Sequence, residues 1–188
     1  AWLPATKAAT LGDAGRPRTA DIEGFYIQLR EVTHGEFASW LKESKTKAPK
    51  AWKAKGKRDA PVVRVSYADA KAYAKARAMR LPTGDEWEYA ARGSDGLRWP
   101  WGDAAEPAHC NWSGSEARGT VREAGSFPAD VSPSGCLDMA GNVAEWARGP
   151  KGPQVRGGSF MTRQLENTRG AFYVDIGASE RHKAVGFR

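Results

Sequence analysis

The chain has 188 residues, an apolar content of 40% and a mean hydropathy of −0.62, and no apolar run approaches membrane-spanning length. This length suits one domain, residues 1–188, with a core of its own. A net charge of +7 suits an acidic protein, a nucleic acid or an anionic surface and does not choose among them. Because the chain begins at Ala1 rather than Met, the sequence leaves open whether a leader or anchor was removed.

The first predicted helix follows a weakly patterned N-terminal segment. Ala1–Asp21 shows no strong periodicity and is expected to be an entry segment anchored by Trp2 and Leu11, whereas Phe25–Leu29 is expected to be a short strand. Thr33 and Glu36 have the spacing of a capping box, which predicts a helix over about 34–43. His34 has no second histidine or cysteine near it and is expected to be a first-turn residue.

Lys42–Arg58 is the one charge run, with eight basic residues, one acid and Trp52. A basic run with an aromatic could bind nucleic acid. No aromatic series or nucleic-acid motif accompanies it, so a solvated loop with Trp52 packed back on the domain is favoured.

Two further capping-box spacings predict the remaining helices. One begins at Ser66 and runs to Met79, before Pro82, since the residue before a proline avoids helical angles. The other begins at Thr83 and runs to about Arg92.

The character of the chain changes after Gly93. Proline and glycine recur, segments are short, and no helix of more than one turn is expected. Val155–Phe160 and Ala171–Ile176 are expected to be strands.

The segment Gly135–Trp146, GCLDMAGNVAEW, concentrates polar groups around a predicted turn. Gly141 supplies conformational freedom, Asn142 tolerates left-handed angles, and a strand is expected after it. Asp138 and Glu145 flank the turn, and such an oxygen-rich cluster suits calcium. The alternative is an Asx-turn before a core strand, with Glu145 paired to an arginine.

This segment resembles the formylglycine-generating-enzyme (sulfatase-modifying factor) family. Further blocks match in the same order: Phe25–Leu41, Pro61–Gly93, Trp99–Asp103, Val155–Phe160 and Val185–Arg188. The resemblance implies an α+β, C-type-lectin-like fold, in which two to three helices pack against irregular β-structure and long ordered loops are held by calcium.

The resemblance also implies calcium ligands. In the first site these are the side chains of Asp138 and Glu145 and the carbonyls of Gly141 and Val143; Asp138 stands where the best-known member has asparagine. A second site would use Asn111 and the Trp112 carbonyl, with its remaining ligands expected within 116–121.

The copper chemistry of the family does not carry over. The two copper-binding cysteines beyond the glycine-glycine-serine motif fall on Thr162 and Asn167, and 161–185 contains no cysteine. Because soft copper(I) needs soft ligands, no copper is expected. Iron is not expected either, since the sulfoxide-synthase branch of the family uses three histidines, most of them in an extra N-terminal domain, and His34, His109 and His182 have no metal spacing.

Two cysteines remain, Cys110 and Cys136, each just before a predicted ligand loop. A disulfide between them would staple the two loops and is typical of an oxidising compartment. Two unrelated buried thiols are the alternative.

The sequence therefore predicts a non-catalytic binding, regulatory or accessory domain with structural calcium. It would act on a protein partner or within a larger complex outside the cytoplasm, in the periplasm or as a secreted protein. One alternative is a metal-dependent oxidoreductase of the same family, of formylglycine-generating or sulfoxide-synthase type; another is a subunit that docks through Lys42–Arg58. The sequence does not name the ligand or the oligomeric state.

The family's pocket lies where the glycine-glycine-serine strand, the segment after it and the terminal strand meet. Five residues there are predicted to bind the partner: Arg163, Asn167, Arg169, Tyr173 and Arg181. Arginine forks and an aromatic suit an anionic partner. The alternative is that the arginines pair with internal acids.

Overall fold

The computed structural model describes residues 1–13, 15–53, 56–115 and 119–188. Three α-helices lie in the first half of the chain: α1 (His34–Ser44), α2 (Tyr67–Ala76) and α3 (Gly84–Arg92). Each begins with the predicted capping box, in which Thr33, Ser66 or Thr83 exchanges hydrogen bonds with an acid three residues on. The second helix ends before Met79 because Ala78 has a left-handed φ of 56°.

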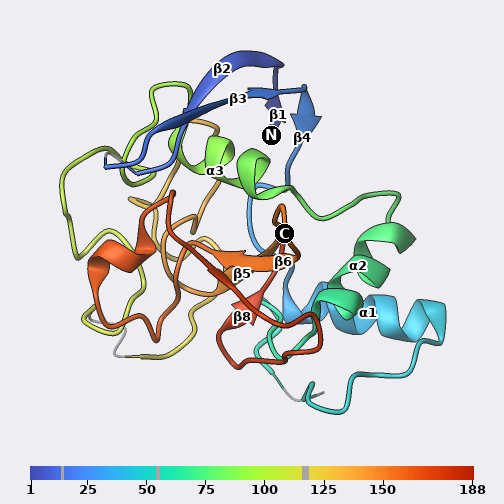
Figure 1. Ribbon diagram of the computed structural model, residues 1–188. Helices are drawn as coiled ribbons and strands as arrows, with labels where there is room; N and C mark the ends of the chain where they lie inside the picture. The colour runs from blue at the N-terminus through green and yellow to red at the C-terminus, as the bar shows by residue number, and fades with distance from the viewer. Residues whose placement is uncertain (14, 54–55, 116–118) are drawn as a thin grey trace.

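A mixed sheet lies at the centre (Figure 1). Its strands are β5 (Ala144–Arg148), β6 (Pro153–Arg156), β7 (Tyr173–Asp175) and β8 (Val185–Gly186), in the order β7-β6-β5-β8, with β8 parallel to β5. β6 is shorter than expected, since Gly157 (84°) and Gly158 (69°) take positive φ angles. After Gly93, the described helical structure is one 3-10 turn, η1 (Leu165–Thr168).

The N-terminal segment contains strands that the sequence analysis missed. β1 (Trp2–Leu3) pairs with β4 (Phe25–Tyr26), and β2 (Thr6–Leu11) forms a hairpin with β3 (Arg18–Ile22). A register shift follows Thr6, and Ala8 has a φ of 51°. This irregularity breaks the two-residue alternation by which a strand is recognised.

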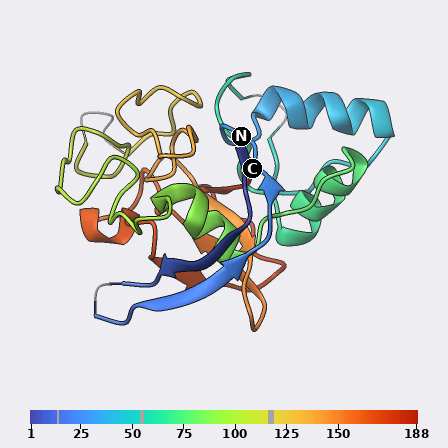
Figure 2. The same cartoon turned by 90° about the horizontal axis from the view of Figure 1, so that it is seen from above.

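Two main hydrophobic clusters hold the elements together. One joins α1 and α2 to the sheet through rings such as Phe37, Tyr73 and Trp146, and the other lies under the hairpin and α3 around Leu11 and Trp87. Figures 1 and 2 show α3 against the hairpin, with α1 and α2 grouped away from it. α3 contacts β5 and β6 as well, so it links the hairpin to the sheet beside the predicted ligand loop.

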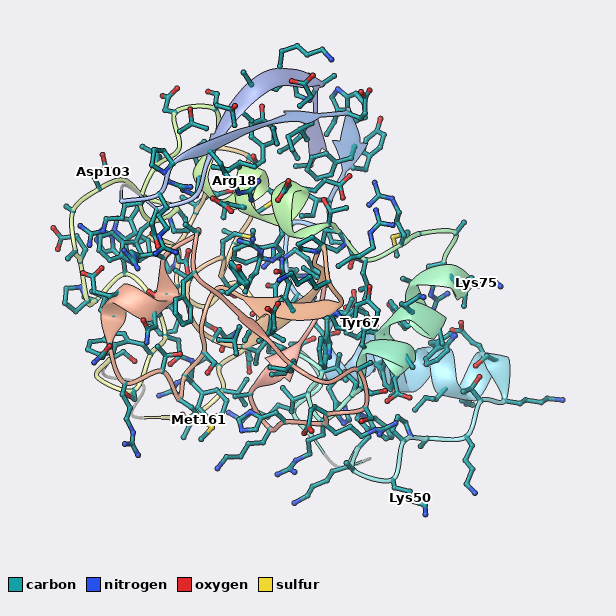
Figure 3. All side chains as sticks on the ribbon, viewed as in Figure 1. Arg18, Lys50, Tyr67, Lys75, Asp103 and Met161 are labelled. Atoms are coloured by element: carbon teal, nitrogen blue, oxygen red, sulfur yellow. The ribbon has the colours of Figure 1, made fainter. Side chains whose placement is uncertain are left out.

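In the basic segment, of which residues 54–55 lie outside the described residues, the tryptophan packs back on the domain as predicted. Trp52 packs on the core, with its ring centroid 4.8 Å from that of His34 and 5.9 Å from that of Phe37. Lys50 is exposed and extends outward (Figure 3). Within the described ranges, no helix is long and apolar enough to cross a bilayer.

Candidate functional site

The segment 135–146 forms a buried, turn-rich loop that leads into β5. Gly141 (90°) and Asn142 (50°) have positive φ angles, as the sequence predicted. A Cβ at Gly141 would lie 2.3 Å from the Asn111 carbonyl oxygen, so only glycine fits this approach. Asp138 also has a positive φ, 53°, which the sequence did not indicate.

Glu145 is held by an arginine at the end of the sequence. Arg188 Nη2 lies 2.6 Å from Glu145 Oε1, and its Nε lies 2.7 Å from Oε2. Trp87 Nε1 also donates to Oε2, at 2.7 Å. Burial alone would lower the pKa of Arg188, but the Glu145 carboxylate raises it above its ordinary value. This is the arginine pairing that stood as the alternative to a calcium ligand.

Three other carboxyl groups lie nearby and form what we call the acid cluster: Glu31, Asp130 and Asp138, which are 0%, 0% and 2% exposed. One oxygen of each accepts a hydrogen bond, from the Asn142 amide to Glu31 (2.9 Å) and from main-chain N–H groups to the other two. The second oxygen of each accepts no N–H or hydroxyl group among the described residues, and the Glu31 and Asp138 carboxyl groups lie close enough to share a proton in a hydrogen bond.

The acid cluster is short of positive charge. Burial raises the pKa of all three carboxyl groups, and the charge of Asp138 raises those of Glu31 and Asp130 further. Arg188 acts in the opposite direction on each, but its guanidinium is already bonded to Glu145. Such an enclosure must take up protons or a hard cation.

The predicted calcium ligands fit in part. Asp138 offers an unpartnered oxygen, whereas both oxygens of Glu145 are already bonded. Among the residues that the structure describes, no three His, Cys, Asp or Glu side chains are placed to hold a metal together. A calcium ion here would therefore need main-chain carbonyls such as those of Gly141 and Val143 beside the acid cluster.

The second predicted calcium site has its polar groups engaged. Asn111 donates its amide to the Thr120 carbonyl and to Asn142 Oδ1, both at 3.0 Å, and its Oδ1 accepts the Ser115 hydroxyl at 3.4 Å. The Trp112 carbonyl accepts the N–H (3.0 Å) and the hydroxyl (2.8 Å) of Ser115. Of the remaining candidate ligands in 116–121, residues 116–118 lie outside the described residues.

The predicted disulfide is wrong. Cys110 and Cys136 are free, buried thiols in separate hydrophobic clusters. Cys110 packs with Trp99, while Cys136 lies 3.9 Å from the Gln28 carbonyl. Burial raises the pKa of both thiols, that of Cys110 to about 12, so both are protonated near neutral pH. Proximity to two loops in sequence did not translate into facing side chains.

The positions that correspond to the copper ligands serve the local turn. Thr162 Oγ1 accepts the N–H of Ser159 at 2.8 Å, and Thr162 N donates to the Ser159 carbonyl at 2.8 Å. Asn167 lies in η1, half-buried. A hydroxyl and a carboxamide at these places are hard, neutral groups.

The predicted partner-binding residues do not form one cluster. Arg169 pairs with Asp13 (3.2 Å), and Arg181 pairs with Asp69 (3.0 Å), so both follow the internal-pairing alternative. Tyr173 is 49% exposed on β7, with the Arg156 guanidinium 5.2 Å from its ring centroid. Arg163 is exposed and forms no ion pair within the described part of the chain.

Sequence reasoning missed Glu31 and Asp130. Glu31 lies between a short strand and α1, and Asp130 follows a proline-containing turn; both positions suggest exposed acids. The fold brings both acids to the loop 135–146, and no local pattern in a single sequence indicates this.

Comparisons with known proteins agree with this architecture. The family model described as a sulfatase-modifying factor enzyme 1-like domain matches residues 5–188. An inactive C-alpha-formylglycine-generating enzyme 2 of Bos taurus is 38% identical over 134 residues, covering 66% of this chain and 42% of the relative. A hercynine oxygenase of Mycolicibacterium thermoresistibile is 37% identical over 178 residues, covering 75% of this chain and 39% of the relative. The chain thus spans about two fifths of the length of these relatives.

Two solved structures share the fold at low identity. A variable protein of Treponema denticola superposes with a TM-score of 0.80 at 18% identity, over 99% of this chain and 92% of that one. PvdO of Pseudomonas aeruginosa superposes with a TM-score of 0.78 at 23% identity, over 99% and 91%. The α+β prediction is confirmed, and the chain belongs to the sulfatase-modifying factor, or formylglycine-generating-enzyme-like, family.

Proposed function

We propose that this chain is a non-catalytic binding or accessory domain of its family, which engages a protein or ligand outside the cytoplasm. The observation that supports this most is the chemistry at the copper positions. Thr162 accepts a main-chain hydrogen bond at 2.8 Å and Asn167 stands at the second position; neither is a soft ligand for copper(I).

The two cysteines elsewhere do not offer a substitute. Cys110 and Cys136 are both buried, and burial raises the pKa of each thiol. Because metals and electrophiles react with thiolates, neither side chain supplies a copper ligand or a nucleophile in the folded chain.

Calcium is proposed as a structural ion at the loop 135–146. The unpartnered oxygens of the acid cluster support it, and calcium takes carboxylate and carbonyl oxygens in flexible geometry. Asp138 and Glu31 would supply charge and the carbonyls of Gly141 and Val143 would complete the shell, while Glu145 would neutralise Arg188.

The proposed location outside the cytoplasm rests on the proposed calcium site, because the two cysteines are free and form no disulfide. Extracellular calcium modules work with dissociation constants of about 10⁻⁴–10⁻³ M, which intracellular calcium does not saturate. A measured affinity in that range would support the location, and a submicromolar affinity would argue against it.

Introducing cysteines at the two copper positions tests whether the wild-type chain is non-catalytic. The wild-type chain and a Thr162→Cys/Asn167→Cys variant are titrated with copper(I) under a competing chelator and then given a cysteine-containing peptide. We expect no tight copper binding and no peptide oxidation by the wild type, and copper binding by the variant. Peptide oxidation by the wild type would overturn the proposal.

A second candidate is a metal-dependent oxidoreductase, favoured by the 37% identity to a hercynine oxygenase. The histidines give it little support, since His34 stacks on Trp52 and His109 contacts Trp101. Metal analysis of the purified chain separates the two: calcium alone favours binding, and iron or copper favours an enzyme. Docking through Lys42–Arg58 is a third candidate, which a pull-down at low and high salt tests.

A further inference from the structure

A cavity of about 450 Å³ lies where the first turn of α3 meets the edge of the central sheet. Its lining comes from elements far apart in sequence: β3, the start of α3, the end of β5, the β5–β6 turn, β6 and β7. Arg18 of β3 lies against α3 at this place (Figure 3). The charged residues that line it are three arginines and one acid: Arg18, Arg148, Arg156 and Asp85.

The end of α3 offers main-chain donors to this cavity. The N–H groups of a first helical turn have no acceptor within the helix, and the helix dipole favours an anion there. In α3 the Thr83 hydroxyl caps Glu86 N, so Gly84 and Asp85 carry the remaining first-turn N–H groups. Both residues line the cavity.

A glycine brings buried side-chain donors to the same helix end. A Cβ at position 84 would lie 1.9 Å from Gln154 Nε2 and 3.1 Å from Arg156 Nη2. Gly84 therefore lets two side chains of β6 approach the helix terminus more closely than any other residue would allow.

These side chains hold donors that the folded chain does not use. Gln154 and Arg156 are 1% and 2% exposed, yet Gln154 Nε2 and Arg156 Nε have no hydrogen-bond partner among the described residues. Buried polar groups are nearly always paired. Arg156 bonds Glu88 through Nη1 at 3.2 Å, but burial still lowers its pKa, so its charge is incompletely compensated.

The three arginines differ in how they are neutralised. Arg18 Nη2 lies 2.6 Å from Asp85 Oδ1. Arg156 pairs with Glu88, which also pairs with Arg92. Arg148 is exposed, lines the cavity and takes part in no ion pair within 1–13, 15–53, 56–115 and 119–188. Tyr173 forms a wall through its contact with Arg156.

We propose that this cavity is a binding site for an oxyanion group, a carboxylate or phosphate, held by the α3 terminus, the side chains of Gln154 and Arg156, and Arg148. Arginine forks and helix termini both bind such planar or tetrahedral oxyanions. An oxyanion would be the ligand class for the proposed binding function. Anion binding itself does not depend on that function, but its biological role does.

Anion titration of the isolated chain tests the site directly. Succinate and inorganic phosphate are titrated at constant ionic strength, and amide shifts are followed by NMR. We expect saturable shifts at Gly84 and Asp85. Arg148→Ala should weaken binding about tenfold, as for the loss of one charge-assisted hydrogen bond. Arg122→Ala, an exposed arginine outside the cavity and outside the predicted partner set, is the matched control and should change nothing.

Gln154→Met distinguishes a built site from general attraction to a basic protein. The variant keeps the volume of the side chain, removes the unpartnered amide and should weaken binding while the chain stays folded. Equal shifts by chloride, or equal loss in the Arg148 and Arg122 variants, would overturn the proposal. Preference between succinate and phosphate identifies the ligand class. The copper and peptide assays are independent of this titration, so failure of either proposal leaves the other distinguishable.

Discussion

Two buried charge centres lie beside the loop 135–146, and they are completed in different ways. The Arg188–Glu145 pair is saturated, with two short contacts between the charged groups and a third bond from Trp87. The acid cluster has three carboxyl groups, each with one unpartnered oxygen. The first centre needs nothing beyond the chain itself, whereas the second gains from protons or a cation. The difference separates a structural ion pair from a candidate ligand site.

Breaking the saturated centre should give the largest effect. Arg188→Met leaves Glu145 buried and unpaired, so we expect a loss of about 3–5 kcal/mol in the free energy of unfolding, measured by urea denaturation. The double variant Arg188→Met/Glu145→Gln removes both charges and should recover part of this loss. A loss below about 1 kcal/mol in the single variant would mean that water reaches Glu145.

Calcium removal should give the next largest effect, and only through the acid cluster. A ligand at 100 times its dissociation constant adds about 2.7 kcal/mol to the native state, so chelation should lower the melting temperature. Glu31→Gln should reduce that dependence, because it removes one charge without changing shape. Glu23→Gln, an exposed acid, is the control. An identical wild-type melting curve with calcium and with chelator would exclude the ion.

The fold was more predictable from sequence than the site. The helix starts follow from local signals, since a threonine or serine and an acid three residues later determine a cap regardless of the rest of the chain. The β2–β3 hairpin was missed because Ala8 interrupts its alternation.

The site depends on distant residues instead. The partner of Glu145 is 43 positions away, and Glu31 meets Asn142 across 111 positions. The loop itself was recognisable, but neither Glu31 nor Asp130 carries a local mark of burial. The cysteine prediction failed for the same reason, because closeness to a loop in sequence says nothing about which side a thiol faces.

The pH dependence of the calcium-free protein should show a smaller effect. Burial raises the pKa values of Glu31, Asp130 and Asp138 in the folded state, so the folded chain holds protons that the unfolded chain releases. The contribution of the acid cluster to stability should therefore be greatest below the ordinary carboxyl range and fall as pH rises above it, whereas Glu36 and Glu86, whose pKa values are lowered, contribute with the opposite sign. The slope is about 1.4 kcal/mol per pH unit for each extra proton.

Denaturation in chelator across this pH range measures the slope. Saturating calcium should flatten it, since the ion replaces the protons. The wild type should lose more stability with rising pH in chelator than Glu31→Gln does, since the variant lacks one of the raised carboxyl groups. Equal pH dependence in the two proteins would show that Glu31 holds no extra proton in the folded chain.

Breaking an exposed ion pair should have the smallest effect on stability. Such a variant can therefore show a loss of partner binding that is not caused by unfolding. Arg181 lies 3.0 Å from Asp69 on the surface, and such pairs contribute below about 1 kcal/mol. Arg181→Ala should thus leave the melting temperature almost unchanged, whatever its role in binding. Arg30→Ala, which breaks the comparably exposed pair with Glu36, lies outside the predicted partner set and is the control. If both variants bind a captured partner as the wild type does, the partner surface excludes Arg181; if only Arg181→Ala loses binding at unchanged stability, the residue acts in recognition.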